Sequence, residues 1–326
     1  MLTYAQRYVN LDHVLLNAFD SVLTLFLMGL LGFYLVRKGL VNQDAKNFLP
    51  RFVVGYALPL YLFSTAIKEL SRGDLPGLLT GTALAVVTMT LTLILAMVFI
   101  RVLKVRQGRQ GLFAVGFTFS NTMFLGLPIN VALFGESALP FVISYFFSNS
   151  LMFWTVGSYL MSLDGPGQKS QIFSLETVKR FFNPPLTGFL IGLFLVVLEI
   201  PIPGFVASSA RMLGSTTTPL AIIFIGMSLA DLDLKSLRLE KDIVFVMLGR
   251  FLICPLITMT LCLAVNLSPG LNRVFIIQSS LPVLANCSIM AGYYRSDTSF
   301  AVLIVSLTTT LSLFTVPLFR LLVSFI

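Results

Sequence analysis

Apolar runs long enough to cross a membrane follow one another along almost the whole chain, and only short polar segments separate them. A transmembrane α-helix needs about 20 mostly apolar residues to span the hydrocarbon core. Ten such runs, which we number as spans 1 to 10, cover residues 13–36, 48–67, 75–103, 111–133, 138–162, 183–200, 205–230, 241–266, 271–293 and 298–324. The pattern therefore predicts an all-α integral membrane protein with about ten transmembrane helices.

The composition supports this prediction and excludes two other classes of protein. Of the 326 residues, 56% are hydrophobic and 11% are charged, and the mean hydropathy is +0.92. A soluble protein carries about 25% charged residues, and this chain has no long polar stretch that could form a large soluble domain. The strands of a membrane β-barrel would show alternation over about ten residues, and the sequence has no such pattern.

The basic residues fall mainly in every second connection between the spans. Fifteen of the 22 Lys and Arg residues lie on one side of the predicted bundle: Arg37, Lys38, Lys46, Arg51, Arg101, Lys104, Arg106, Arg109, Lys169, Lys179, Arg180, Lys235, Arg238, Lys241 and Arg295. Cytoplasmic loops carry the excess of Lys and Arg, so both termini are expected to be non-cytoplasmic in a multi-pass protein of the cell (inner) membrane. The net charge of +8 is therefore a topology signal, and no nucleic-acid partner is expected.

The chain divides into two halves of five spans each, joined by a polar segment rich in Gly, Ser and Gln. We expect a first repeat over residues 1–165, a cytoplasmic linker over 166–180 and a second repeat over 181–326. Spans 2 and 7 contain the similar motifs LPLYLF and TPLAIIF, and spans 4 and 9 each contain a central proline with asparagine nearby. Because five is an odd number, a duplicated half must enter the membrane upside down, which predicts an inverted repeat.

Spans 4 and 9 carry polar residues and a proline where a membrane helix is expected to be apolar. Span 4 reads GFTFSNTMFLGLPIN over residues 116–130, and span 9 reads IIQSSLPVLANCSIMAG over 276–292. Proline removes a backbone donor and displaces the carbonyl four residues earlier, so span 4 is expected to unwind over 124–127 and to restart at Pro128. Pro282 should interrupt span 9 in the same way. Irregular backbone is tolerated within a membrane only where it is buried in protein or lines a cavity.

The two restarted half-helices would direct the positive ends of their dipoles at a common site, which predicts that this site binds an anion. The residues expected to form it are Asn121, Thr122, Pro128, Asn130, Pro282, Asn286 and Ser288, with Ser279 and Ser280 as weaker candidates. The same amides and hydroxyls can instead satisfy freed carbonyls or join helices. The sequence leaves this alternative open for each residue taken singly.

Arg250 lies near the middle of span 8, and an intramembrane charge indicates a functional role by default. Its guanidinium can bind a carboxylate through two hydrogen bonds. The alternatives are that it caps the carbonyls of a broken helix, or that it pairs with an acid such as Glu136 or Asp231. Polar residues in other spans are weaker candidates, because such residues more often pack helices together. These weaker candidates are Asn149, Tyr56 and Ser64.

The sequence offers no combination of residues typical of catalysis. It contains a single histidine, no Ser/His/Asp set, no metal-ligand spacing and no Gly-rich phosphate loop. Its three cysteines, Cys254, Cys262 and Cys287, lie within apolar spans without a CxxC motif and are expected to be small buried hydrophobic residues. We therefore expect that the protein is not an enzyme and has no catalytic residue, metal or cofactor.

Four segments of the chain resemble a known family of carriers. FSNTMFLGLP in span 4 and LPVLANCSIMAGYY in span 9 are similar to the matching segments of the auxin efflux carrier family, as are TPLAIIFIGMSLADL in span 7 and GRFLICPLI in span 8. This family includes bacterial malate and malonate permeases and is related to the plant PIN-formed auxin exporters. The chain lacks the long central loop of the plant branch, which favours the bacterial carboxylate branch.

The resemblance implies ten helices in two inverted five-helix repeats, divided into a scaffold and a mobile transport domain. It also implies that broken helices 4 and 9 cross at the site of a carboxylate substrate, with roles for Asn121, Pro128, Pro282 and Asn286. The expected function is secondary transport of small organic anions, such as malate, malonate or auxin-like acids, by alternating access. The alternative is a sodium- or proton-coupled symporter of the bile-acid or antiporter type. The expected partners are the anion and the lipid bilayer, and a homodimer is left open.

Overall fold

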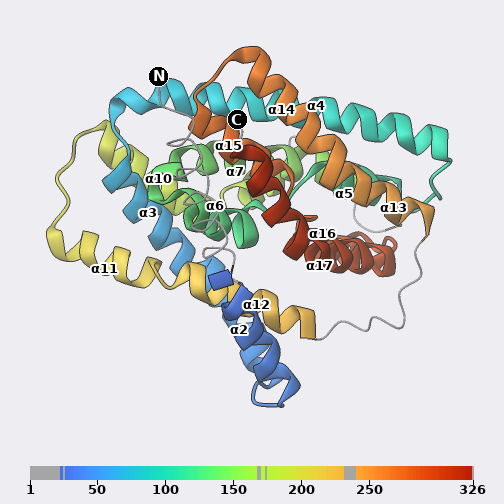
Figure 1. The fold of residues 1–326 in the computed structure, drawn as a ribbon, viewed down its shortest axis with the longest axis horizontal. Coiled ribbons are helices and arrows are strands. Elements are labelled where there is room, and N and C mark those ends of the chain that lie inside the picture. Colours follow the sequence, from blue (N-terminus) through green and yellow to red (C-terminus); the bar gives the residue numbers. More distant parts are fainter. Residues whose placement is uncertain (1–22, 25, 167–169, 173–174, 231–239, 325–326) are drawn as a thin grey trace, which may run out of the picture.

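The computed structural model describes residues 23–24, 26–166, 170–172, 175–230 and 240–324, whose regular secondary structure is helical (Figure 1). Six helices in these residues are long and apolar enough to cross a membrane: Gln43–Glu69, Arg72–Leu103, Glu136–Ser162, Gly204–Ala230, Lys241–Val265 and Thr298–Val323. The shorter apolar helices are Phe26–Arg37, Thr122–Phe134 and Pro184–Val197. The prediction of an all-α protein is confirmed.

Several of the long helices consist of two or more segments. The first half of the chain contains α2 (Gln43–Phe52), η1 (Val53–Ala57), α3 (Leu58–Glu69), η2 (Arg72–Asp74), α4 (Leu75–Leu103), α5 (Gln110–Thr118), η3 (Thr122–Gly126), α6 (Leu127–Phe134), η4 (Glu136–Ala138), α7 (Leu139–Met152), η5 (Phe153–Gly157) and α8 (Ser158–Ser162). The second half contains α9 (Leu175–Phe181), α10 (Pro184–Val197), α11 (Gly204–Gly214), α12 (Thr217–Ala230), α13 (Lys241–Leu248), η7 (Gly249–Ile253), α14 (Cys254–Val265), α15 (Pro269–Ser279), α16 (Asn286–Tyr294) and α17 (Thr298–Val323).

The described residues contain fewer uninterrupted spans than the ten predicted, for identifiable reasons. Predicted spans 4 and 9 are each divided into shorter helices. Predicted span 1 begins outside the described residues, and predicted span 6 corresponds to α10, which has 14 residues. Spans 3 and 10 match their predicted bounds closely, as α4 and α17, because each is a long and mostly apolar run that stays helical although α4 has a proline in its first turn and α17 contains Pro317.

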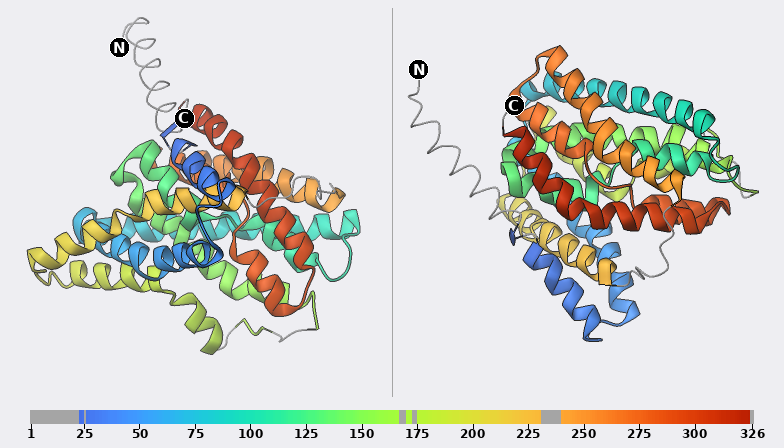
Figure 2. Two further views of the ribbon diagram at one scale, coloured as in Figure 1. Left: turned by 90° about the horizontal axis from the view of Figure 1, so that it is seen from below. Right: turned by 45° about the vertical axis from the view of Figure 1, so that its right-hand side comes forward.

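Helices α3, α10 and α11 form one closely packed group, which α2 and α12 extend (Figures 1 and 2). Glycine allows this approach. A Cβ atom at Gly188 of α10 would lie 2.4 Å from the carbonyl oxygen of Pro59, and one at Gly214 of α11 would lie 2.6 Å from the Cα of Tyr61. Small residues at helix contacts are the usual means by which membrane helices pack, since lipid provides no hydrophobic drive between helices.

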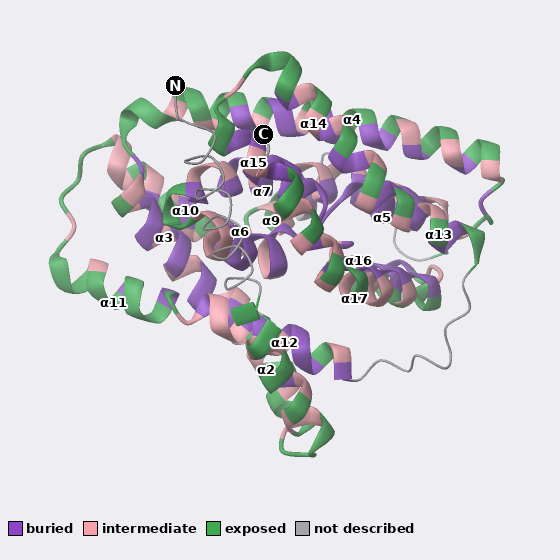
Figure 3. Cartoon of the chain, viewed as in Figure 1, coloured by how far each residue is buried: buried purple, intermediate pink, exposed green. Residues whose placement is uncertain are grey.

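Helices α4, α5, α7 and α13 to α17 form a larger bundle around a buried core (Figure 3). Within it, α5 is buried from Gly111 to Thr118, because α4, α8, α13, α16 and α17 all contact it. Helices from the two halves of the sequence are mixed here, as α5 packs against α13 and α7 packs against α15. The predicted linker, residues 166–180, lies partly outside the described residues, and its end forms the first turns of α9.

Candidate functional site

Two interrupted helices form the centre of the larger bundle. In span 4, α5 ends at Thr118 and the chain becomes extended at Phe119, before helical structure resumes at Thr122. In span 9, α15 ends at Ser279, and α16 begins at Asn286. The prediction that both spans are interrupted is therefore confirmed.

The position of the first interruption differs from the prediction. The backbone does not unwind over residues 124–127, because π-helical η3 runs from Thr122 and continues directly into α6. Pro128 lies in the first turn of α6, where a missing backbone N–H costs little. The helix therefore restarts before the proline, and the expectation that it restarts at Pro128 was wrong.

Asn121 ends the break and begins the second half-helix. Its side-chain oxygen accepts a hydrogen bond from the backbone N–H of Phe124 at 3.2 Å, as an N-cap residue does. Its backbone carbonyl accepts a hydrogen bond from Gly126 at 3.0 Å, which closes the wider π-helical turn. Asn121 thus lies at the interruption and its side-chain oxygen starts a helix, while its role in substrate binding stays a prediction.

The two unwound segments pair with each other as a short antiparallel bridge. Ser120 lies opposite Val283 in this bridge. The N–H of Asn121 donates to the carbonyl of Pro282 at 2.9 Å, and the N–H of Leu284 donates to the carbonyl of Phe119 at 3.3 Å. Pairing satisfies backbone groups that would otherwise be unpartnered in an apolar environment, where each costs several kcal/mol.

Side chains from two other helices complete the bonding of these segments. Asn149 of α7 accepts a hydrogen bond from the Ser120 N–H at 3.2 Å and donates one to the Ser120 carbonyl at 3.1 Å. Thr308 of α17 accepts a hydrogen bond from the N–H of Val283 at 3.1 Å. Asn149, a weaker candidate from the sequence, thus binds both backbone groups of Ser120. Thr308 was not identified from the sequence.

Arg250 is fully buried beside the break, and its guanidinium donates hydrogen bonds to main-chain carbonyls. Its partners are the carbonyls of Phe117, Thr118, Ser279 and Leu281. The Ser279 contact is 2.6 Å and the Leu281 contact is 3.1 Å. These carbonyls belong to the C-terminal ends of α5 and α15 and the residues after them, where the helix dipole is negative and carbonyls lack helical partners.

Of the interpretations left open for Arg250, the structure shows the capping of broken-helix carbonyls. Glu136 pairs instead with Lys68, and Asp231 lies outside the described residues. Arg250 has no ion pair among the described residues. Its Nε and both terminal nitrogens each donate to at least one carbonyl, so four of the five guanidinium N–H groups have a main-chain partner.

The remaining predicted residues fall into three groups. Asn130 donates to the carbonyl of Gly126 one turn earlier at 2.7 Å, whereas the Thr122 hydroxyl lies 3.5 Å from the amide nitrogen of Asn149, which holds the unwound segment. Partly exposed residues at the start of α16 are Asn286 and Ser288. Hydroxyl groups that donate to carbonyls of their own helix are those of Ser279, Ser280 and Ser64.

Tyr56 is not brought to the crossing. It is 67% exposed on η1, and its ring lies 6.1 Å from that of Phe52. Gln278, by contrast, was missed by the sequence analysis. It is fully buried against Gly126, and neither of its amide atoms has a partner among the described residues. A glutamine one turn before a mid-span proline is a signal that could have identified it.

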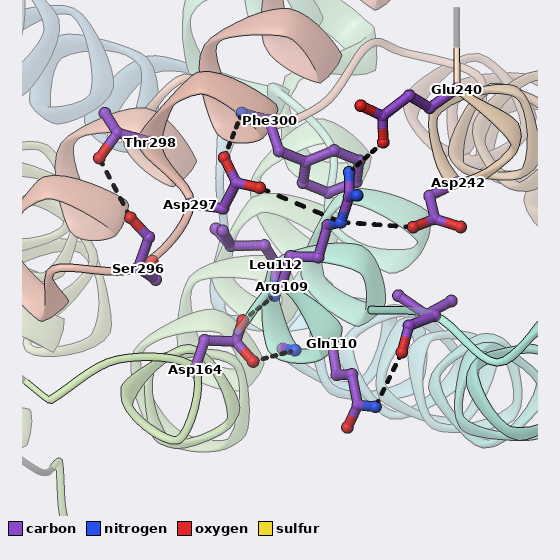
Figure 4. A network of polar contacts seen from close by, with 12 residues as sticks. Arg109, Gln110, Leu112, Asp164, Glu240, Asp242, Ser296, Asp297, Thr298 and Phe300 are labelled. Atoms are coloured by element: carbon purple, nitrogen blue, oxygen red, sulfur yellow. Dashed lines mark hydrogen bonds and ion pairs between the residues drawn. The ribbon is translucent and has the colours of Figure 1, made fainter. Parts of the chain in front are cut away.

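The far end of α5 is fixed by a network of charged groups (Figure 4). Arg109, which precedes α5, pairs with three carboxylates, those of Glu240, Asp242 and Asp297. Asp164 accepts hydrogen bonds from the N–H groups of Gly111 and Leu112 at 2.9 and 2.8 Å, where an acid complements the positive end of the helix. In the described residues, no group of three or more His, Cys, Asp or Glu could hold a metal ion.

Comparison with known proteins gives a consistent result over almost the whole chain. The sequence profile of a family described as membrane transport protein matches residues 17–320. An uncharacterized transporter of Methanothermobacter thermautotrophicus is 27% identical over 310 residues, which cover 94% of this chain and 98% of the relative. The uncharacterized transporter MJ1031 of Methanocaldococcus jannaschii is 25% identical over 312 residues, covering 92% and 96%.

Proposed function

The chain belongs to the membrane transport protein family, the family of the auxin efflux carriers, and we propose that it is a secondary transporter of small organic anions. The observation that carries this proposal is the pairing of two interrupted helices, in which Arg250 binds the carbonyls of two of the four half-helices. The substrates proposed are carboxylates such as malate, malonate or auxin-like acids.

The charge of the substrate follows from which half-helix ends are compensated. Each helix end carries about half an elementary charge, positive at the N-terminus and negative at the C-terminus. The guanidinium of Arg250 compensates the negative C-terminal ends of α5 and α15. The positive ends are the N-termini of η3 and α16, at Thr122 and Asn286. An anion near these two N-termini would be stabilised, and a cation would be repelled by the helix dipoles and by the guanidinium behind them.

We propose that the neutral groups of Asn121, Thr122, Asn286 and Ser288 bind the carboxylate. Pro128, Asn130 and Pro282 would shape the backbone around the site. The positive charge of Arg250 would attract the anion without direct contact. This arrangement places a full positive charge close to the anion without requiring that the guanidinium leave its carbonyl partners.

Alternating access would arise from movement between the two helix groups. We propose that α2, α3 and α10 to α12 form a scaffold, because glycine contacts hold α10 and α11 tightly against α3 and because α2 packs against α12, and that the larger bundle carries the two interrupted helices. Two inverted five-helix repeats, non-cytoplasmic termini and a location in the cell membrane belong to the same proposal, and the distribution of Lys and Arg supports the orientation.

The proposal is tested by uptake into proteoliposomes. Labelled malate, malonate and indole-acetate should enter vesicles that contain the protein faster than vesicles without it, and a methyl ester or amide of the same acid should not compete. Imposed proton and sodium gradients would identify coupling. Absence of uptake of every acid, together with transport of an ammonium analogue, would contradict the proposed charge of the site.

A further inference from the structure

A cavity of about 310 Å³ separates the helix Phe26–Arg37 and α12 from α6 and α17. Its walls are mostly apolar side chains, including Phe33, Leu125 and Val316. Two hydroxyl groups also line it, but those of Thr310 and Ser312 donate to carbonyls of their own helix. The cavity therefore offers apolar surface and few free hydrogen-bond donors.

Arg37 is the charged residue that lines this cavity. It ends the helix Phe26–Arg37, and its guanidinium lies 5.2 Å from the centre of the Phe33 ring. No ion pair of Arg37 occurs within the part of the chain that the structure describes. A cation at the rim of an apolar cavity matches a ligand with one anionic group and an apolar chain.

The wall formed by the helix Phe26–Arg37 and α12 is a single packed unit. A Cβ atom at Gly226 would lie 1.8 Å from the carbonyl oxygen of Gly29, and one at Gly32 would lie 2.0 Å from the carbonyl oxygen of Ile223. No such glycine contact joins this unit to α17 among the described residues. The cavity thus lies where one helix unit meets another, and a chain that fills it would contact both.

We propose that this cavity binds one acyl chain of an anionic phospholipid, whose phosphate is bound by Arg37. A ligand such as malate would bury several polar groups against walls that cannot hydrogen-bond them, which is costly. An acyl chain has no such cost, and a guanidinium binds phosphate through two parallel hydrogen bonds. Lys38 adjoins Arg37 and strengthens the attraction of the anionic headgroup. The lipid stabilises the arrangement of the two helix units seen in the structure.

The crossing of spans 4 and 9 is a separate site. Neither Asn121, Asn286 nor Arg250 lines the cavity, although Leu125 and Ile129 of span 4 do. The lipid site therefore does not rest on the proposed substrate, and it can be tested by binding alone.

Native mass spectrometry and thermal unfolding of the full-length protein in detergent test this proposal, with phosphatidylglycerol and phosphatidylcholine as probes. We expect phosphatidylglycerol to remain bound and to raise the Tm more than phosphatidylcholine does. Arg37→Gln should weaken phosphatidylglycerol binding about tenfold, which corresponds to about 1.4 kcal/mol, close to the lower limit for one charge-assisted hydrogen bond. Arg101→Gln is the matched control, because Arg101 is exposed at the end of α4 and does not line the cavity, and it should retain the binding.

A second variant tests the cavity itself and not the charge. Val316→Phe places a larger side chain in the cavity and should remove the lipid-dependent rise in Tm while the protein stays folded without lipid. Equal retention of both lipids by the wild type and Arg37→Gln would overturn the proposal. Binding of indole-acetate or malate that depends on Arg37, without lipid retention, would also overturn it, since the cavity would then be a site for a soluble acid. If the same substitutions abolished a dimer of the protein, the cavity would be occupied by a second copy of the chain and not by a lipid.

Discussion

Replacement of Arg250 by glutamine should destabilise the whole bundle, and not only weaken binding of one class of substrate. The guanidinium donates to four main-chain carbonyls at the ends of two half-helices, all in the buried core. Glutamine has one amide group and no charge, so most of these carbonyls would lose their donor, and the negative ends of α5 and α15 would face each other uncompensated.

The size of the effect can be estimated from the contacts. A buried polar group left without a partner costs about 1–3 kcal/mol, and removal of one partner from a buried charged interaction costs about 3–5 kcal/mol. Because losses within one network are not additive, we expect that Arg250→Gln lowers the free energy of unfolding by about 3–5 kcal/mol. Arg250→Lys keeps the charge but presents a compact ammonium in place of a planar fork, so it should lie between the wild type and Arg250→Gln.

The assay is thermal unfolding of purified protein in detergent, followed by far-ultraviolet circular dichroism. Arg101→Gln serves as the control, since Arg101 is exposed at the end of α4 and its loss should leave the Tm unchanged. A wild-type Tm for Arg250→Gln, combined with a selective loss of dicarboxylate over monocarboxylate transport, would refute the reasoning. That result would mean that Arg250 binds the substrate and does not stabilise the carbonyls.

Three further substitutions test other parts of the site. Asn149→Leu should cost about 1–3 kcal/mol of stability, because both backbone groups of Ser120 lose their partner, and the Tm measures this. Asn121→Ala and Asn286→Ala should each weaken carboxylate binding about tenfold in a calorimetric titration, as one charge-assisted hydrogen bond is worth about 1.5–3 kcal/mol. Asn121→Ser keeps an N-cap acceptor, so equal loss in this variant would point to the amide and not to the cap. Gly188→Val should prevent folding, because its Cβ would overlap the Pro59 carbonyl, and normal yield would exclude the tight α3–α10 contact.

The sequence alone determined the helical class and most helix positions. The bounds of α4 and α17 follow from long apolar runs, because a segment in lipid must bond its own backbone groups and a helix does so within itself. That spans 4 and 9 are both interrupted was also predictable, since each carries a central proline with asparagine nearby.

Only the tertiary structure decided where the first interruption lies and what holds it. Phe119 to Asn121 unwind because partners for their backbone groups come from Pro282, Leu284 and Asn149, which are distant in the sequence. Helical bonding is local and can be predicted from neighbouring residues, whereas an unwound segment needs partners that folding brings from elsewhere. The role of Arg250 also depends on the tertiary structure. Its sequence position shows a charge within a span, but its carbonyl partners come together only when α5 and α15 meet.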